Sequence, residues 1–468
     1  MKRSIFGIAI AFGLACNFAH ADPALTNIDQ ALKIAQAKQE PVLVDFSAIW
    51  CHSCHAMDNK VLNGAEWDAR QSRFVLVRSD ADSANGTAWM KKLDVPALPT
   101  YVVLNPNGSE RGRLTGEFTR AKFYPALDRL LSGADALPRL KADAMHGSTE
   151  AVAKVLLAYD DRDDAPAGLK WYASLPLATR EAAQHDAKTL LQWHIDQMDA
   201  DVSALLKPMK RGGGQRKSVV DAEQRRLERS CRAHAQQALA GTPTVDQRIS
   251  IVQTLTGWCS EHLSASQKKT QAHALLPAFQ ALYDQQAPNG SAGFLREATY
   301  TLAALYMEAG DKASAQSTYQ RTIGIGRKAL DDGHGGFDVK RDQAMTEVLD
   351  EFLDREGTPK EKSVDLALRK AMVEAYPGNA FYQLEYGEIL LKQGHAAAAL
   401  PYLQRAADEA PGGDKLSYTH TLAKALITLN RRPEAEKLFN AALRTAQQQF
   451  PQQTKMYMSM WKHPSDAL

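Results

Sequence analysis

The fold of the first part of the chain is decided by residues 44–54, which read Val44-Asp45-Phe46-Ser47-Ala48-Ile49-Trp50-Cys51-His52-Ser53-Cys54. An apolar, β-branched run predicts a buried strand before the cysteines, and a helical pattern follows them. Cys51 then falls at a helix N-terminus, where unpaired amides and the helix dipole favour the thiolate, so we expect it to be a nucleophile. Cys54 lies within one turn and can attack a mixed disulfide formed by Cys51, as the resolving thiol.

The segments around this stretch predict one α/β domain over residues 22–135. An amphipathic period over residues 24–40 predicts a helix that Pro41 ends. Asn105-Pro106-Asn107-Gly108 predicts a hairpin turn, and residues 120–131 predict a closing helix. The predicted strands are residues 42–46, 74–77, 100–104 and 113–116. This order of elements describes a mixed sheet flanked by helices.

Residues 24–132 resemble the thioredoxin superfamily, because residues 44–54 and Leu98-Pro99-Thr100, which opens a strand, follow its pattern. The resemblance implies that Pro99 is cis, lies against the active cysteines and leaves the preceding backbone to pair with the substrate chain. It also implies that Asp45 is a buried carboxylate that exchanges protons with the resolving thiol, which a raised pKa would suit. The predicted catalytic residues are Cys51, Cys54, Asp45 and Pro99, supported by Trp50, His52 and Thr100.

Within that superfamily, the chain looks most like the C-terminal periplasmic domain of the DsbD-type disulfide reductases. The likeness lies in Val61-Leu62 after the motif helix, in Asp80 and in residues 95–100. It implies a thiol–disulfide oxidoreductase, a reductase or isomerase, that acts on protein disulfides. The membrane electron-feeding domain of that family has no counterpart here, so we expect an unidentified electron donor or acceptor. A protonated His52 would make the disulfide more oxidising, which leaves the direction of electron flow open.

Other uses of the same residues stay open. Cys51-His52-Ser53-Cys54-His55 has the form of a c-type haem attachment motif. Two cysteines and two histidines could ligate Zn²⁺ or Cu⁺, and Met456, Met458 and Met460 add thioethers, as in a periplasmic metal- or copper-handling protein. A structural Cys51–Cys54 bridge would instead leave a non-catalytic domain on an interaction scaffold. We expect the redox-active pair, with no cofactor and no metal.

From Pro138 onward, helical periods replace the strand patterns. They predict a helical domain over residues 136–290 and tetratricopeptide-like repeats over residues 291–468. Such repeats stack antiparallel helix pairs around a concave groove, so we expect a protein partner there. Small, large and turn residues follow the template of about 34 residues at Gly387, Leu390, Gly394, Ala399, Leu403, Ala406 and Pro411. Tyr382, Tyr386 and Tyr418 are the candidates to line the groove.

Cys231 and Cys259 lie in two neighbouring helical patterns, over residues 225–239 and 249–263. Two adjacent antiparallel helices would bring them together in a structural disulfide, worth about 3–4 kcal/mol by chain entropy. Two unpaired buried thiols are the alternative.

Residues 1–21 predict a cleaved secretory signal peptide, because Lys2 and Arg3 precede an apolar stretch and Ala19-His20-Ala21 fits an A-x-A cleavage site. The stretch is shorter than the roughly 20 residues of a spanning helix, so we expect a periplasmic protein with no transmembrane segment after cleavage. Losing Lys2 and Arg3 takes the formal charge from +2 to zero, which leaves no net positive field to attract nucleic acid. The length of 468 residues predicts two to four domains.

Overall fold

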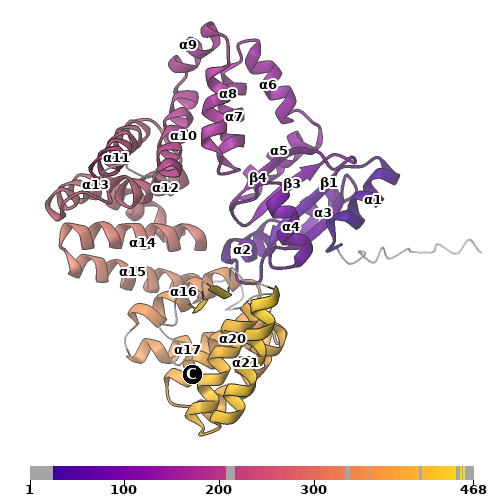
Figure 1. Cartoon of the computed structure of the whole chain (residues 1–468), viewed down its shortest axis with the longest axis vertical. Helices are drawn as coiled ribbons and strands as arrows, with labels where there is room; N and C mark the ends of the chain where they lie inside the picture. The colour runs from indigo at the N-terminus through magenta and orange to yellow at the C-terminus, as the bar shows by residue number, and fades with distance from the viewer. Residues whose placement is uncertain are drawn as a thin grey trace, which may run out of the picture.

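The computed structural model describes residues 25–206, 217–331, 338–357, 359–410, 414–449, 454–455 and 457–458. It has an α/β domain followed by a long helical region, as Figure 1 shows. The predicted signal peptide, and Met456 and Met460 of the C-terminal tail, lie outside the described residues. Within the described ranges, no helix is both long and apolar enough to cross a membrane.

The α/β domain is built on a four-stranded sheet. Its strands are β1 Val42–Ser47, β2 Val75–Asp80, β3 Thr100–Leu104 and β4 Glu110–Thr115, and its helices are α1 Ile28–Lys38, α2 His52–Lys60, α3 Gly64–Gln71, α4 Ala84–Lys92 and α5 Arg120–Leu131. The strand order is β2-β1-β3-β4. β1 runs parallel to β2 and antiparallel to β3, and β3 and β4 form an antiparallel hairpin. The predicted mixed sheet flanked by helices is confirmed.

Side-chain alternation along β1 divides the core of this domain into two layers. Val42, Val44 and Phe46 pack with α1 and α4 on one face of the sheet. Leu43 packs with α2, α3 and α5 on the other face. Asp45 alternates with Val44 and Phe46, so its side chain takes the face of Leu43. The Asp45 carboxyl therefore lies on the face of the sheet that packs against α2.

The rest of the described chain is helical, and the predicted all-helical region with tetratricopeptide-like packing is confirmed. Its α-helices are α6 Leu137–Met145, α7 Thr149–Asp160, α8 Ala165–Ala173, α9 Leu177–His185, α10 Ala187–Leu206, α11 Lys217–Ala240, α12 Val245–Thr256, α13 Ala265–Gln286, α14 Ala292–Ala309, α15 Lys312–Asp331, α16 Gln343–Glu356, α17 Pro359–Ala375, α18 Ala380–Lys392, α19 Ala396–Glu409, α20 Lys415–Thr428 and α21 Arg432–Gln449. A Cβ atom on Gly387 would lie 2.6 Å from the Leu403 side chain. The small residue thus lets α18 and α19 approach closely.

The helical region curves away from the α/β domain and returns to it, as Figure 1 shows. Near its start, Arg162 pairs with Glu110 of β4. Further along, α14 and α16 contact α2. Ala56 of α2 belongs to the same buried apolar cluster as Leu302 of α14 and Val348 of α16, a cluster that spans both sides of residue 290. The helix that begins at the cysteine pair is therefore packed against the inner side of the helical region.

Candidate active site

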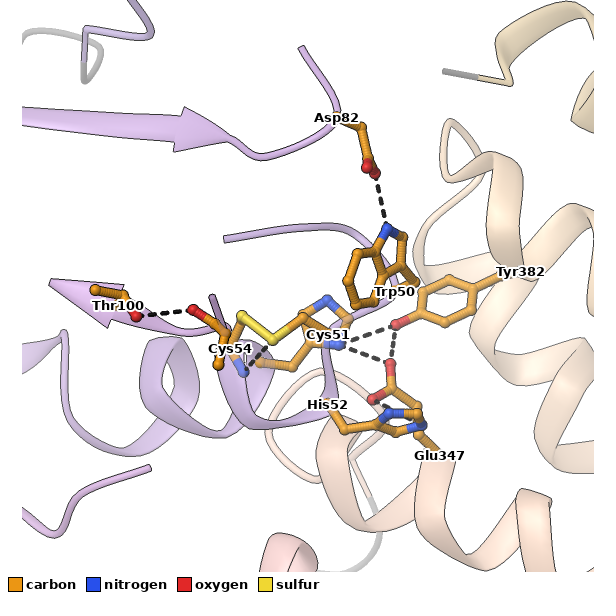
Figure 2. The surroundings of a disulfide bond; sticks show 10 residues. Trp50, Cys51, His52, Cys54, Asp82, Thr100, Glu347 and Tyr382 are labelled. Atoms are coloured by element: carbon orange, nitrogen blue, oxygen red, sulfur yellow. Dashed lines mark hydrogen bonds and ion pairs between the residues drawn. A yellow bond between two sulfur atoms is a disulfide. The ribbon is translucent and has the colours of Figure 1, made fainter. Parts of the chain in front are cut away.

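Cys51 and Cys54 form a disulfide at the start of α2 (Figure 2). Cys51 is the N-cap residue, and its sulfur accepts a hydrogen bond from the Cys54 backbone N–H at 3.1 Å. The sulfur thus lies at the positive end of the helix dipole, which would stabilise a thiolate after reduction. Cys51 is 6% exposed and Cys54 is 3% exposed. The first cysteine is therefore only slightly more accessible than the second.

Asp45 lies fully within the core, and its Oδ1 atom has no hydrogen-bond partner. Burial, and to a smaller extent the charge of Asp58, raise the pKa of Asp45 to about 7 against the opposing charge of Arg78. A carboxyl of this kind gains or loses a proton near neutral pH, as proton exchange with a thiol requires.

The segment before β3 borders the cysteines. The Leu98–Pro99 peptide bond is cis, and Leu98 packs against the small cluster that contains both cysteines. The Gly116 N–H donates to the Pro99 carbonyl at 2.9 Å, and the Thr100 hydroxyl donates to the Ala97 carbonyl at 2.8 Å. These bonds fix the segment beside the disulfide.

Trp50 flanks Cys51 and is 42% exposed. Its indole N–H donates to Asp82 Oδ2 at 2.7 Å, which Figure 2 shows above the disulfide. The hydrogen bond fixes the orientation of a large apolar ring at the accessible side of the site.

A carboxylate of the helical region lies within ion-pair distance of both histidines of the motif. Glu347 of α16 has Oε1 at 2.7 Å from His55 Nδ1 and Oε2 at 3.9 Å from His52 Nε2. The Tyr382 hydroxyl of α18 donates to Oε1 (Figure 2). Burial lowers the pKa of His52, and the charge of Glu347 opposes that shift. The redox motif thus has polar partners more than 290 residues away in the chain.

The other residue between the cysteines, Ser53, also faces the helical region. The Glu117 carboxyl lies beside the hydroxyls of Ser53 and of Ser291, the N-cap residue of α14, and its Oε2 atom has no hydrogen-bond partner. Burial raises the pKa of Glu117, while Lys60 and the two hydroxyls oppose the shift. A Cβ atom on Gly293 would lie 2.5 Å from Glu117 Oε2. Both residues of the His52-Ser53 dipeptide are therefore in contact with groups beyond α2.

A cavity of about 270 Å³ opens beside His52. Arg296 pairs with Glu351 at 2.8 Å on its wall, and Arg369 pairs with Asp350 at 2.7 Å. Met372 and Phe381 supply its apolar surface. The cavity lies next to the motif and has both charged and apolar walls, and its two arginines neutralise part of the acidic side.

Sequence reasoning missed several groups around the motif. His55 was considered only as part of a haem attachment motif or as a possible metal ligand. Glu117 and Glu347 had no signal, because nothing in their local patterns relates them to the cysteines. Tyr382, a candidate to line the repeat groove, lines the cavity beside His52, and its hydroxyl also donates to Glu347, which the sequence did not predict.

Cys231 and Cys259 are joined by a disulfide with a Cα–Cα distance of 5.4 Å, and both are fully buried. Cys231 lies in α11. Cys259 lies in the short 3₁₀ helix η1 Trp258–Ser260, because α12 ends at Thr256 before Gly257. The predicted helix over residues 249–263 is therefore wrong in its second half.

One group of side chains in the described ranges offers three potential metal ligands, Glu228, Glu261 and His262, whose ligand atoms lie within 4.8 Å of one another. Arg232 lies 3.6 Å from Glu228, and its charge disfavours a cation there. The group is not part of the cysteine site.

Comparison with known proteins defines the class of each part. Residues 24–106 match the thioredoxin-like family model, and residues 390–456 match the tetratricopeptide repeat model. The predicted resemblances are confirmed: the chain carries a thioredoxin-like domain with a C-x-x-C pair, followed by tetratricopeptide-like repeats.

Particular relatives match about a quarter of the chain. Thiol:disulfide interchange protein DsbD of Ralstonia nicotianae is 31% identical over 117 residues, which are 24% of this chain and 19% of that protein. Thiol:disulfide interchange protein TxlA of Synechococcus elongatus is 30% identical over 24% of this chain and 56% of that protein. The solution structure of a thioredoxin from Thermus thermophilus is 31% identical over 23% of this chain and 85% of that chain, with a TM-score of 0.22. The chain thus matches about a fifth of the length of the first of these relatives.

Proposed function

We propose that this chain is an exported, periplasmic thiol–disulfide oxidoreductase that acts on protein disulfides, as a reductase or isomerase. The observation that carries the proposal is the Cys51 sulfur at the N-cap of α2, bridged to Cys54, in a domain that buries the Asp45 carboxyl in its core. The names of the relatives support it. The repeats serve to bind protein partners, and an unidentified donor or acceptor recharges the pair.

The reaction begins from the reduced pair. The Cys51 thiolate attacks one sulfur of the substrate disulfide, forms a mixed disulfide and releases the other substrate sulfur as a thiolate, which takes up a proton. Cys54 then loses its proton and attacks the Cys51 sulfur, which releases the second substrate thiol. The substrate gains two electrons and the Cys51–Cys54 pair loses them. In an isomerase, the released substrate thiolate attacks another disulfide of the substrate before Cys54 attacks the mixed disulfide.

The surrounding groups have distinct roles in this scheme. Asp45 accepts the proton of Cys54 when the mixed disulfide is resolved, because its pKa of about 7 matches that task. Cis-Pro99 leaves the Leu98 backbone to pair with the substrate chain, Thr100 fixes that segment, and Trp50 borders the entry.

We propose the domain limits predicted from the sequence: a signal peptide over residues 1–21, the redox domain over residues 22–135, a helical domain over residues 136–290 and repeats over residues 291–468. Salt bridges between Asp135 and both Arg129 and Lys154 lie at the first junction of the mature chain.

Trapping of substrates tests the function. In the full chain, Cys54→Ser removes the resolving thiol, so a mixed disulfide through Cys51 should accumulate and be visible on non-reducing gels. The matched control, Cys51→Ser, keeps Cys54 and should capture nothing. A folded Cys54→Ser chain that captures no protein would contradict the proposal and favour the scaffold alternative.

A further inference from the structure

The cavity beside His52 has more acidic than basic groups on its wall. Its carboxyl groups belong to Glu347, Asp350, Glu351, Asp354 and Glu385, and its guanidinium groups to Arg296 and Arg369. Burial and the neighbouring Asp365 raise the pKa of Asp350 well above its usual value, so this carboxyl can hold a proton at pH 7. Lys392 lies 3.4 Å from Asp354. The remaining carboxylates still leave the wall with an excess of negative charge.

The two arginines of the wall already have acidic partners. Arg296 pairs with Glu351 at 2.8 Å. Arg369 lies 2.7 Å from Asp350 and also pairs with Glu385. Their positive charges are therefore shared among these carboxylates, and a further cation entering the cavity would meet guanidiniums that are already compensated.

Glu347 has one carboxylate oxygen without a partner. Its side chain is 6% exposed, Oε1 accepts from the Tyr382 hydroxyl and lies 2.7 Å from His55 Nδ1, and Oε2 has no hydrogen-bond partner. Figure 2 shows this carboxylate between His52 and Tyr382, which also line the cavity. Burial lowers the pKa of His52, so a neutral imidazole at pH 7 does not supply the missing charge. A buried carboxylate oxygen without a donor is costly, and a cation in the cavity would reduce that cost.

The walls of the cavity fit a basic side chain better than a metal ion. In the ranges that the structure describes, the group of three close metal-ligand atoms is elsewhere, at Glu228, Glu261 and His262. Met372 and Phe381 give the cavity an apolar side. Lysine and arginine carry their charge on an aliphatic stem, which packs on apolar surface while the charged head reaches acidic groups. A volume of about 270 Å³ suits a single side chain rather than a drug-sized ligand.

We propose that this cavity binds a lysine or arginine side chain of the substrate protein, close in sequence to the disulfide that Cys51 attacks, and that Glu347 determines this specificity. His52 lines the cavity and directly follows Cys51, so a substrate segment bound at Cys51 lies next to the cavity. The proposal rests on the proposed function and names its substrate class, which is protein disulfides with a basic neighbour.

The test uses short peptides that each contain one intramolecular disulfide. Lysine or arginine occupies a position one, two or three residues from a half-cystine, and each peptide has a partner with norleucine, which keeps an aliphatic stem without the charge. We expect the reduced full chain to act on the best basic peptide with a kcat/KM about fivefold above that of its norleucine partner, as for a partly buried ion pair. The ratio should fall at high salt.

Glu347→Gln should bring this ratio below about twofold. The ratio isolates recognition, because both peptides react with the same cysteine and any change in its reactivity cancels. Glu356→Gln is the matched control, since Glu356 lies on the same helix, is close to Arg355 and does not line the cavity. It should keep the wild-type ratio. If Glu347→Gln fails to fold, Glu351→Gln replaces it, because it frees the charge of Arg296 on the same wall and should also lower the ratio.

Equal kcat/KM values for basic and norleucine peptides at all three positions would overturn the proposal, and so would a wild-type ratio in a folded Glu347→Gln chain. Failure of the proposed function looks different. In that case the chain reduces neither peptide, while cysteine-free versions still show tighter binding of the basic peptide to the oxidised chain by calorimetry. Equal binding of the cysteine-free pair would show that the cavity does not recognise a basic side chain.

Discussion

At the scale of single residues, Asp45 links stability to chemistry. Its pKa rises from 3.8 to about 7 because the carboxyl is buried. Between these values the folded chain holds a proton that the unfolded chain has lost, so this group makes the folded state less stable as pH rises through the window. Above pH 7 the cost stays constant. The ionised Asp45 thus destabilises the folded state at the position where the proposed reaction needs a proton acceptor.

Asp45→Asn should therefore stabilise the chain above pH 7 and leave it nearly unchanged at pH 4, where the wild-type carboxyl is protonated. A shift from 3.8 to about 7 at 1.36 kcal/mol per unit sets an upper bound of about 4 kcal/mol. Urea unfolding of both chains across this range measures the difference. At pH 7 the same substitution should slow resolution of the mixed disulfide at least about tenfold. A variant that is less stable than the wild type at pH 8 would contradict this account.

The residues that could be predicted from the sequence are those whose signal is local. Cys51, Cys54 and Asp45 lie within ten positions of one another, and Leu98-Pro99 opens a recognisable strand. Glu347 and Glu117 reach the same site only through tertiary packing. Glu347 looks like any other acidic residue of an amphipathic helix, and Glu117 lies in the loop between β4 and α5, so no pattern identified them.

At the scale of elements, the prediction identified the apolar parts of helices and strands but missed their polar ends. β2 continues through Arg78, Ser79 and Asp80, because each pairs with a residue of β1 in the parallel register. The predicted strand ended at Val77, the last apolar residue. The 3₁₀ turn at Cys259 escaped prediction in a similar way, because periodicity continues past Gly257 although the backbone does not.

The contact between the start of α14 and the cysteine motif depends on Gly293, whose lack of a side chain leaves room for Glu117. Gly293→Ala would bring a Cβ atom to 2.5 Å from Glu117 Oε2, so Glu117 or α14 must move. We expect the reduced Cys51 thiol to react several-fold faster with iodoacetamide in this variant, because α2 is held less tightly. Gly324→Ala is the control, since no atom lies within 4 Å of its Cβ position in α15. It should keep the wild-type rate and gain about 0.5–1 kcal/mol of stability. Equal alkylation rates in the two variants would show that this contact does not restrain α2.

At the scale of the whole molecule, the sequence predicted a redox domain followed by helices but not their mutual arrangement. The helical region returns to α2, and Ala56 joins an apolar cluster formed mostly by α12–α17. Spacing along the chain carries no information about such a return, because it depends on the summed angles between successive helix pairs. The redox motif is therefore partly covered by segments that the sequence suggested were a separate module.

A fragment of residues 22–135 should show what this cover does. It retains the sheet with apolar layers on both faces, so we expect it to fold. Without α14 and α16, its Cys51 should reduce a small disulfide about tenfold faster than the full chain does, because the cysteine loses its cover. Ala56→Glu in the full chain should produce a similar increase, since a carboxylate cannot remain in the apolar cluster. In the fragment, Ala56 faces solvent, so the same substitution should have little effect. If the fragment and the full chain react at equal rates, the helical region does not restrict access to the cysteines, and it contributes partner binding alone.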